Sequence, residues 1–235
     1  MPGQLEGQIA LVTGASRGIG AAVAEALAQA GAHVILTART SAGLEEVEER
    51  IHKAGGTATI APLDLTDPDS IGRLAQAIAG RWEKLDILVL NAAMLGTLAP
   101  VQHLDAKEFA QIFTLNVSAQ AALIAAFDAL LRKSGQARLI GITSSVGASP
   151  RAFWGAYGAS KAAFNTLLGA YAEENRNTGR LAVAIIDPGA TRTKMRAQAY
   201  PGEDPASLKS PDDVARRILL LLTDGFETGH TERIG

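Results

Sequence analysis

The stretch Thr13-Gly14-Ala15-Ser16-Arg17-Gly18-Ile19-Gly20 decides the fold predicted for this chain. It follows the apolar run 9–12 and opens an alanine-rich segment, so it predicts a strand, a glycine turn and a helix start. The free N–H groups and positive dipole end of such a turn favour a bound phosphate. Gly14 would permit the tight turn, Gly18 a close approach to a pyrophosphate, and Gly20 close packing of the helix on the sheet. The spacing G-x-x-x-G-x-G differs from the common G-x-G-x-x-G, and an ordinary βα turn is the alternative interpretation.

The composition narrows the class of protein. With 235 residues the chain is long enough for one large α/β domain, and we see no linker that divides it. A net charge of -2 and a pI near 6.1 give no basic footprint for nucleic acid or an anionic membrane. The absence of cysteine excludes disulfides and thiolate chemistry. We expect no signal peptide, and apolar runs such as 218–222 are too short to span a bilayer, which favours a cytoplasmic protein.

Apolar runs and helix-like periodicities alternate along the rest of the chain. Strands are predicted over 9–12, 33–37, 57–63, 86–90, 138–143 and 181–186, and helices over 18–30, 44–51, 67–78, 105–131 and 157–173. Pro211, after Ser210, predicts one more helix start. The alternation predicts a single doubly wound Rossmann-type α/β domain over 1–235, a parallel sheet with helices on both faces. The ligand of such a sheet binds outside the carboxyl ends of its strands.

The residues that follow the predicted strands are candidates for cofactor binding. After the second strand, where an acidic residue would bind the ribose 2′-hydroxyl of NAD, the chain has Ala38 and Arg39. Arg39 and Arg17 could place two guanidinium groups around a 2′-phosphate, which favours NADP(H) over NAD(H). Two solvated surface arginines are the alternative. Asp64 could accept a hydrogen bond from adenine and Asn91 could meet the ribose or tie strands together, although both residue types also cap turns routinely.

Three polar residues are candidates for catalysis: Ser144, Tyr157 and Lys161. Tyr157 and Lys161 are four residues apart in a predicted helix and therefore share one face. A free phenol has a pKa near ~10, and a neighbouring ammonium would stabilise its phenolate and make the proton available near neutral pH. Ser144 ends the fifth strand and could hold a substrate oxygen. A chance helical pair is the alternative for Tyr157 and Lys161.

The chain resembles the classical short-chain dehydrogenase/reductases, from Ile9 to about Gly229, and its local stretches 154–157 and 188–193 are most similar to bacterial members of unassigned substrate. The marks of this resemblance are the glycine turn, Asp64, Asn91-Ala92, Asn116, Ser144, Tyr157 to Lys161, and Pro188-Gly189 with Thr193. The resemblance implies that Tyr157 gives a proton to a carbonyl, that Lys161 lowers its pKa and holds the ribose, and that Ser144 orients the carbonyl. It also implies that Asn116 anchors a water leading to Lys161, and that Pro188, Gly189 and Thr193 fix the nicotinamide. The implied cofactor contacts are Gly14, Ser16, Arg17, Gly18, Ile19, Gly20, Arg39, Asp64, Leu65, Asn91, Ala92, Tyr157, Lys161, Pro188, Gly189, Thr191 and Thr193.

Several features depart from the family pattern or stand outside it. Ala93 replaces a usual glycine beside the cofactor, which we expect to be tolerated. The segment 192–209, a short substrate lid at about 190–210, suggests an open site or one completed by another subunit. The chain stops at Gly235, which puts a seventh strand and the assembly it supports in question. Phe153 and Trp154 either wall the substrate pocket or pack a loop on the core. The four histidines, His33, His52, His103 and His230, lack metal-ligand spacing and are predicted to be surface or turn residues.

These features favour an NADP(H)-dependent oxidoreductase that moves hydride between nicotinamide and a carbonyl or secondary alcohol, with Tyr157 as general acid and base. The expected partners are a small-molecule substrate and further copies of the chain in a homodimer or homotetramer, with no nucleic acid and no membrane. The main alternative is a cofactor-binding sensor or interaction protein with little catalysis. A methyltransferase would have no use for Tyr157 and Lys161, and an epimerase of the extended branch would need a longer substrate-binding portion.

Overall fold

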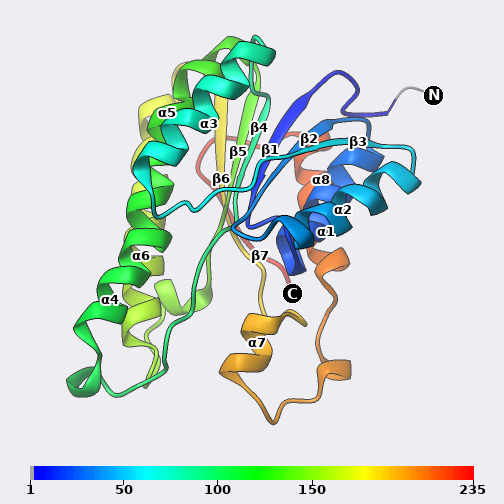
Figure 1. Ribbon diagram of the computed structural model, residues 1–235. Coiled ribbons are helices and arrows are strands. Elements are labelled where there is room, and N and C mark those ends of the chain that lie inside the picture. The colour runs from blue at the N-terminus through cyan, green and yellow to red at the C-terminus, as the bar shows by residue number, and fades with distance from the viewer. Residues whose placement is uncertain (1–2) are drawn as a thin grey trace.

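The computed structural model describes residues 3–235 and contains one seven-stranded parallel sheet (Figure 1). Every neighbouring pair of strands runs parallel, and the register aligns Leu11 with Ile35 on one side and with Leu88 on the other. In spatial order the strands are β3 (Thr57–Ile60), β2 (His33–Thr37), β1 (Ile9–Thr13), β4 (Ile87–Leu90), β5 (Ala137–Ile142), β6 (Leu181–Asp187) and β7 (His230–Arg233). The strand order reverses between β1 and β4, which is where a doubly wound sheet opens a crevice for a ligand.

Two layers of helices cover the sheet, and Figure 1 shows one on each face. The first layer holds α1 (Gly18–Gln29), α2 (Ser41–Lys53) and α8 (Pro211–Asp224), and the second holds α3 (Pro68–Arg81), α4 (Ala106–Phe113), α5 (Ala119–Ser134) and α6 (Gly155–Asn175). Each layer forms a hydrophobic core with one face of the sheet. Successive strand residues point to opposite faces, so Leu11 packs against the second layer and Val12 against the first. The doubly wound α/β fold predicted from the sequence is therefore confirmed.

The predicted helix 105–131 is divided in the structure. A π-helical turn, η2 (Thr114–Ser118), separates α4 from α5 within one continuous helical stretch. By length and composition alone this stretch, Ala106–Ser134, could cross a membrane. Its side chains Leu123, Phe127 and Leu131 are fully buried, however, in the core between this helix and the sheet. Contact with the sheet thus accounts for its apolar character.

Three other expectations from the sequence need correction. The third strand ends at Ile60 rather than at 63, and only single hydrogen bonds continue beyond it, from the Ala61 N–H to Leu36 of β2 and from the Leu63 N–H to Ala38, just after β2. A seventh strand does form, as β7 pairs with β6 over 230–233. His33 lies on β2, as the predicted strand 33–37 implies, but it is partly buried rather than a surface or turn residue, and its ring nitrogens are hydrogen-bonded to the hydroxyls of Thr57 and Thr59.

The start of α8 follows the sequence prediction. Ser210 caps the helix by accepting a hydrogen bond from the Asp213 N–H, and the Asp213 carboxylate accepts one from the Ser210 N–H. This capping box stabilises the helix start with Pro211 in its first turn. It also fixes the point where the chain returns from the segment 192–209 to the body of the protein.

Candidate active site

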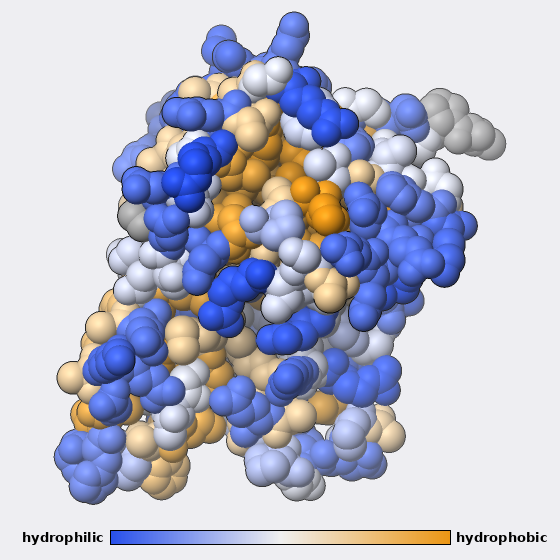
Figure 2. Space-filling view, in the orientation of Figure 1, coloured by the Kyte–Doolittle hydropathy of each residue, from blue (hydrophilic) through white to orange (hydrophobic). Residues whose placement is uncertain are grey.

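One cleft of about 1100 Å³ runs along the carboxyl ends of the central strands. It passes from the glycine turn and Arg39, across the ends of β1, β4 and β5, to the short helix α7 (Lys194–Ala199). Figure 2 shows the hollow between the α4 side and the α7 side in the lower half of the molecule, with hydrophilic residues across the middle of this face. The volume is large enough for a dinucleotide together with a small substrate.

The glycine turn at one end of the cleft has the geometry of a phosphate-binding turn. Gly14 and Gly18 have positive φ angles of 65° and 59°, which favour glycine. A Cβ at Gly14 would lie 2.9 Å from Asn91 Nδ2, and one at Gly20 would lie 2.4 Å from the carbonyl oxygen of Gly14. Arg17, which precedes α1, makes no side-chain cap, so the N–H groups of the first turn stay available for an anion. These features fit the pyrophosphate of a dinucleotide.

Asn91 ties the two strands at the switch point together. Its Nδ2 donates to the carbonyl oxygens of Thr13 at 2.9 Å and Gly14 at 3.3 Å, and its N–H donates to Thr13 Oγ1 at 2.9 Å. Of the two roles considered from the sequence, tying strands is the one that the side chain fills here. Ala93 also lines the cleft, and its φ is not positive, so the methyl group that replaces a glycine is accommodated without backbone strain.

Arg17, Arg39 and Asp64 line the end of the cleft that a nucleoside would occupy. Both arginines are exposed, and neither makes an ion pair within residues 3–235. Asp64 accepts hydrogen bonds from the N–H and hydroxyl of Thr66 at 2.9 and 2.8 Å, so it does cap a turn. These bonds lower the pKa of its carboxyl, and Arg39 contributes in the same direction. The carboxylate therefore stays charged near Arg39.

Tyr157 and Lys161 lie on α6, where the cleft meets the end of β5, and Ser144 lines the same region. Tyr157 and Lys161 are buried, with exposed fractions of 7% and 3% respectively. Lys161 Nζ donates to the carbonyl oxygen of Ile142 at 2.8 Å and lies 5.7 Å from the centre of the Tyr157 ring. Burial lowers the pKa of Lys161 to about 8.

The pKa of Tyr157 moves opposite to the direction expected from the sequence. Burial raises the pKa of its phenol, and the carboxylate of Asp187 at the end of β6 adds to the effect. In the protein alone, burial and Asp187 therefore set the direction of the shift. The depressed pKa is therefore a prediction for the cofactor-bound protein, in which a positively charged nicotinamide ring adds a second cation.

Asn116 lies in the π-helical turn and does not line the cleft. Its Nδ2 donates to the carbonyl oxygen of Met94 at 2.9 Å and to Ser160 Oγ at 3.0 Å, while its Oδ1 accepts from the Met94 N–H at 2.9 Å. Asn116 thus clamps the loop after β4 against α6, one residue before Lys161. Its role in a water path to Lys161 stays a prediction.

The other end of the cleft is apolar and aromatic. Leu95, Tyr157 and Val146 form a small buried cluster, against which Trp154 and Met195 pack. The Trp154 ring lies 6.0 Å from that of Tyr157 and 5.8 Å from that of Tyr200. Trp154 therefore walls the pocket, as one of the two interpretations from the sequence proposed.

Phe153, in contrast, does not line the cleft. Its side chain is 56% exposed, and its φ of 72° is the one positive φ outside glycine among the described residues. Its carbonyl oxygen accepts a hydrogen bond from the Ala99 N–H at 3.1 Å. Backbone strain at Phe153 thus accompanies the placement of Trp154 at the pocket wall.

The segment 192–209 forms an arm that projects from the sheet and carries α7 (Figure 1). A bridge between Thr191 and Lys209 closes its neck, and the Arg192 N–H donates to the Lys209 carbonyl oxygen at 2.9 Å. Within the arm, the Arg196 guanidinium pairs with the Glu203 carboxylate through two hydrogen bonds and lies 3.8 Å over the Tyr200 ring. We name this segment the lid arm; it is braced internally and stands over one side of the cleft.

Comparisons with known proteins identify the family. A family model described as short chain dehydrogenase matches residues 8–204. The chain belongs to the short-chain dehydrogenase family. The oxidoreductase YciK of Escherichia coli K12 is 39% identical over 223 residues, which cover 94% of this chain and 88% of that protein. The enzyme is thus an oxidoreductase with an NAD(P)-binding Rossmann fold.

Two solved structures of similar proteins contain a cofactor. A short-chain dehydrogenase from Shigella flexneri 2a, complexed with NADP, is 38% identical with a TM-score of 0.93 and covers 99% of each chain. Another from Escherichia coli CFT073, complexed with NADPH, is also 38% identical, with a TM-score of 0.93, and covers 99% of this chain and 98% of that one. The fold of this dehydrogenase therefore corresponds closely to that of cofactor-binding relatives.

The cleft gathers most of the residues predicted from the sequence. Of the predicted site residues, only Asn116 and Gly20 do not line it: Asn116 lies behind the loop after β4, and Gly20 packs against Gly14. Other lining residues were not predicted from the sequence, among them Met94, Leu95, Gly96, Glu108, Leu115 and Lys194. Met94 to Gly96 could have been found, because they follow a predicted strand. Nothing in the pattern indicated that Glu108, Leu115 or Lys194 points into the cleft.

Proposed function

We propose that this dehydrogenase transfers hydride between NADP(H) and a carbonyl or secondary alcohol, with Tyr157 as general acid and base. The observation that supports the proposal is one continuous cleft, which carries Arg17 and Arg39 at one end and Ser144, Tyr157 and Lys161 at the other. A cofactor long enough to span this cleft would place its reactive ring beside the Tyr157 hydroxyl. Two similar proteins solved with NADP and with NADPH support the same choice of cofactor.

The residues around Tyr157 suit proton transfer. A bound nicotinamide would supply the hydride. Ser144 Oγ would donate a hydrogen bond to the substrate carbonyl oxygen, and Tyr157 would give that oxygen its phenolic proton as the carbonyl carbon accepts the hydride. Lys161, charged below its pKa of about 8, would stabilise the phenolate left behind. In the oxidative direction the phenolate takes the proton from the alcohol.

Selectivity for the phosphorylated cofactor rests on charge. Arg17 and Arg39 come from the glycine turn and from the residues after β2, the two places that border the adenosine ribose in this fold. No acidic residue stands after β2 to bind a free 2′-hydroxyl. Planar guanidinium groups can hold a phosphate through paired hydrogen bonds. Assembly into a dimer or tetramer and a cytoplasmic location stay predictions.

The proposal is tested by incubating the enzyme and its Tyr157→Phe variant with NADPH and a panel of ketones, keto esters and acyl thioesters. The enzyme should oxidise NADPH with at least one carbonyl compound. Tyr157→Phe should bind NADPH normally yet lose roughly 10²- to 10⁴-fold in turnover, because the phenolic proton is gone. Near-normal turnover of the variant would refute the role of Tyr157, and cofactor binding without any turnover on the whole panel would favour a sensor.

A further inference from the structure

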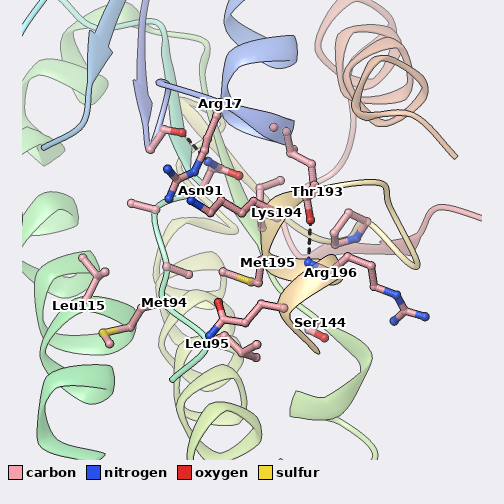
Figure 3. A pocket seen from close by; sticks show the side chains of 18 of the residues that line it. Arg17, Asn91, Met94, Leu95, Leu115, Ser144, Thr193, Lys194, Met195 and Arg196 are labelled. Carbon is pink, nitrogen blue, oxygen red and sulfur yellow. Dashed lines mark hydrogen bonds between the residues drawn. The ribbon is translucent and has the colours of Figure 1, made fainter. Parts of the chain in front are cut away.

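The lid arm begins beside the phosphate-binding turn. A Cβ built on Gly18, the first residue of α1, would lie 3.5 Å from Thr193 Cγ2. Thr193 is itself fixed, because its Oγ1 accepts a hydrogen bond from the Arg196 N–H at 3.1 Å (Figure 3). The next residue, Lys194, therefore starts from a defined place beside the glycine turn.

Lys194 extends into the cleft, not outward. It lines the cleft together with Arg17 and Asn91. Figure 3 shows its side chain directed along the cleft toward the side of Arg17 and Asn91, whereas Met195 is directed toward Leu95 and the substrate end. Two consecutive residues of α7 thus face the two halves of the site.

Lys194 has no ion-pair partner among residues 3–235, and the carboxylates that line the cleft bind other groups. Within residues 3–235 neither Lys194 nor Arg17 forms an ion pair, whereas Arg196 in the same arm pairs with Glu203. The carboxylates that line the cleft are engaged elsewhere: Asp64 with Thr66, Glu108 with Thr97, and Asp187 with the Gly189 N–H and Arg233. An ammonium in the cleft that has no carboxylate partner favours a bound anion.

We propose that Lys194 is a cofactor phosphate ligand carried by the lid arm, which binds the pyrophosphate from the side opposite the glycine turn. This inference rests on the proposed function, since it takes a dinucleotide as the ligand. The pyrophosphate is favoured over the 2′-phosphate because the neighbouring Thr193 lies beside Gly18, where the positive end of the α1 dipole is found. An ammonium on a flexible stem suits this role, because it acts as a point charge without demanding a fixed geometry.

The arrangement couples cofactor binding to the position of the lid arm. The arm is closed at its neck by Thr191 and Lys209 and braced inside by the Arg196–Glu203 pair. A phosphate held by Lys194 at one end of α7 therefore restrains the whole arm, including Met195 and Tyr200 at the substrate end. A bound dinucleotide thus helps to build the pocket that receives the second substrate.

Titrations of NADPH and NADH with Lys194→Met and Lys194→Arg test the inference by fluorescence. Lys194→Met keeps the length of the side chain without the charge and should weaken both dinucleotides by the same factor, about five- to tenfold. Lys194→Arg should retain most of the affinity. Lys107→Met, which removes an exposed lysine of α4 outside the cleft, is the matched control and should change neither affinity.

A second readout follows the lid arm itself. Amide hydrogen exchange over 192–209 should slow when the unmodified protein is saturated with NADPH, and this protection should shrink in Lys194→Met at saturating cofactor. Unchanged affinity for both dinucleotides would overturn the inference. A loss confined to NADPH would also overturn it, because Lys194 would then contact the 2′-phosphate. If the unmodified protein binds neither dinucleotide, the proposed function itself fails, and the inference with it.

Discussion

The two halves of the cleft are built in different ways. The cofactor half consists of residues that directly follow strands, such as Gly14, Arg39 and Asn91, so the sheet itself dictates their positions. The substrate half consists of Trp154, Met195 and neighbouring side chains that come from a loop and the lid arm. Charged groups in the first half are exposed, whereas the aromatic groups in the second pack against each other. The fold thus positions the residues of the cofactor half, whereas a loop and the lid arm shape the substrate half.

Lys161 lies where the two halves meet, and its burial predicts the largest effect on stability. Burial lowers its pKa from 10.5 to about 8, so below pH 8 the folded protein bears the full cost of a buried charge. Between these values the unfolded chain binds more protons than the folded one, and the free energy of unfolding therefore rises with pH, by up to about 3 kcal/mol.

This prediction is checked by urea unfolding of the cofactor-free protein and of Lys161→Met at about pH 7 and about pH 10. Methionine keeps the apolar stem but has no proton to lose, so the variant should lack the rise that the lysine contributes. The difference between the two proteins removes the contribution of all other titrating groups. An equal pH dependence in both would show that the charge of Lys161 is not penalised by burial.

A change at Trp154 should affect substrate binding without affecting cofactor binding. Trp154→Ala removes the wall between Tyr157 and Tyr200 and should raise the KM for a carbonyl substrate about tenfold, a loss of about 1.4 kcal/mol. The affinity for NADPH should stay the same, because Trp154 lies at the substrate end. Trp82→Ala is the matched control, since that ring packs against His33 away from the cleft and should change stability without changing the KM. A weaker NADPH affinity in Trp154→Ala would break the division into halves.

The smallest effect is expected at Phe153, where the backbone is strained but the side chain is exposed. Phe153→Asn should raise the free energy of unfolding by roughly 0.5–1 kcal/mol, because asparagine tolerates the left-handed conformation better and little buried area is lost. Thermal or urea unfolding measures the change. Val101→Asn is the control, as this side chain is 71% exposed on a backbone without positive φ, and it should not stabilise the protein. A destabilised Phe153→Asn would mean that the phenyl ring makes contacts that outweigh the strain.

The same division explains how much the sequence predicted. Apolar runs and the residues after them located the strands and most of the cofactor half, because a parallel sheet places the ends of its strands together. The π-helical turn around Asn116 escaped prediction, since one extra residue in a helical turn leaves no trace in a short periodicity. Lys194 escaped as well, because its direction depends on the placement of Thr193 beside Gly18, and these two residues are far apart in the sequence.

The effect of burial on the pKa values of the catalytic candidates could not be predicted from the sequence. The spacing of Tyr157 and Lys161 predicted that they share a helix face, and the structure places them so. Both pKa values depend on desolvation, and that of Tyr157 depends also on Asp187, which no local pattern contains. The seventh strand, His-Thr-Glu-Arg, lacks apolar residues because it is a partly exposed edge, and its pairing with β6 identifies it only in three dimensions.

The role of Arg17 and Arg39 in selecting NADP(H) is tested by comparing the affinities of the protein for NADPH and for NADH, before and after both arginines are changed to alanine. NADPH should bind at least tenfold more tightly than NADH, a difference of about 1.4 kcal/mol, and the double variant should lose this preference while its affinity for NADH changes little. Equal or tighter binding of NADH by the unmodified protein would contradict the account, because the two arginines would then have no part in choosing the cofactor.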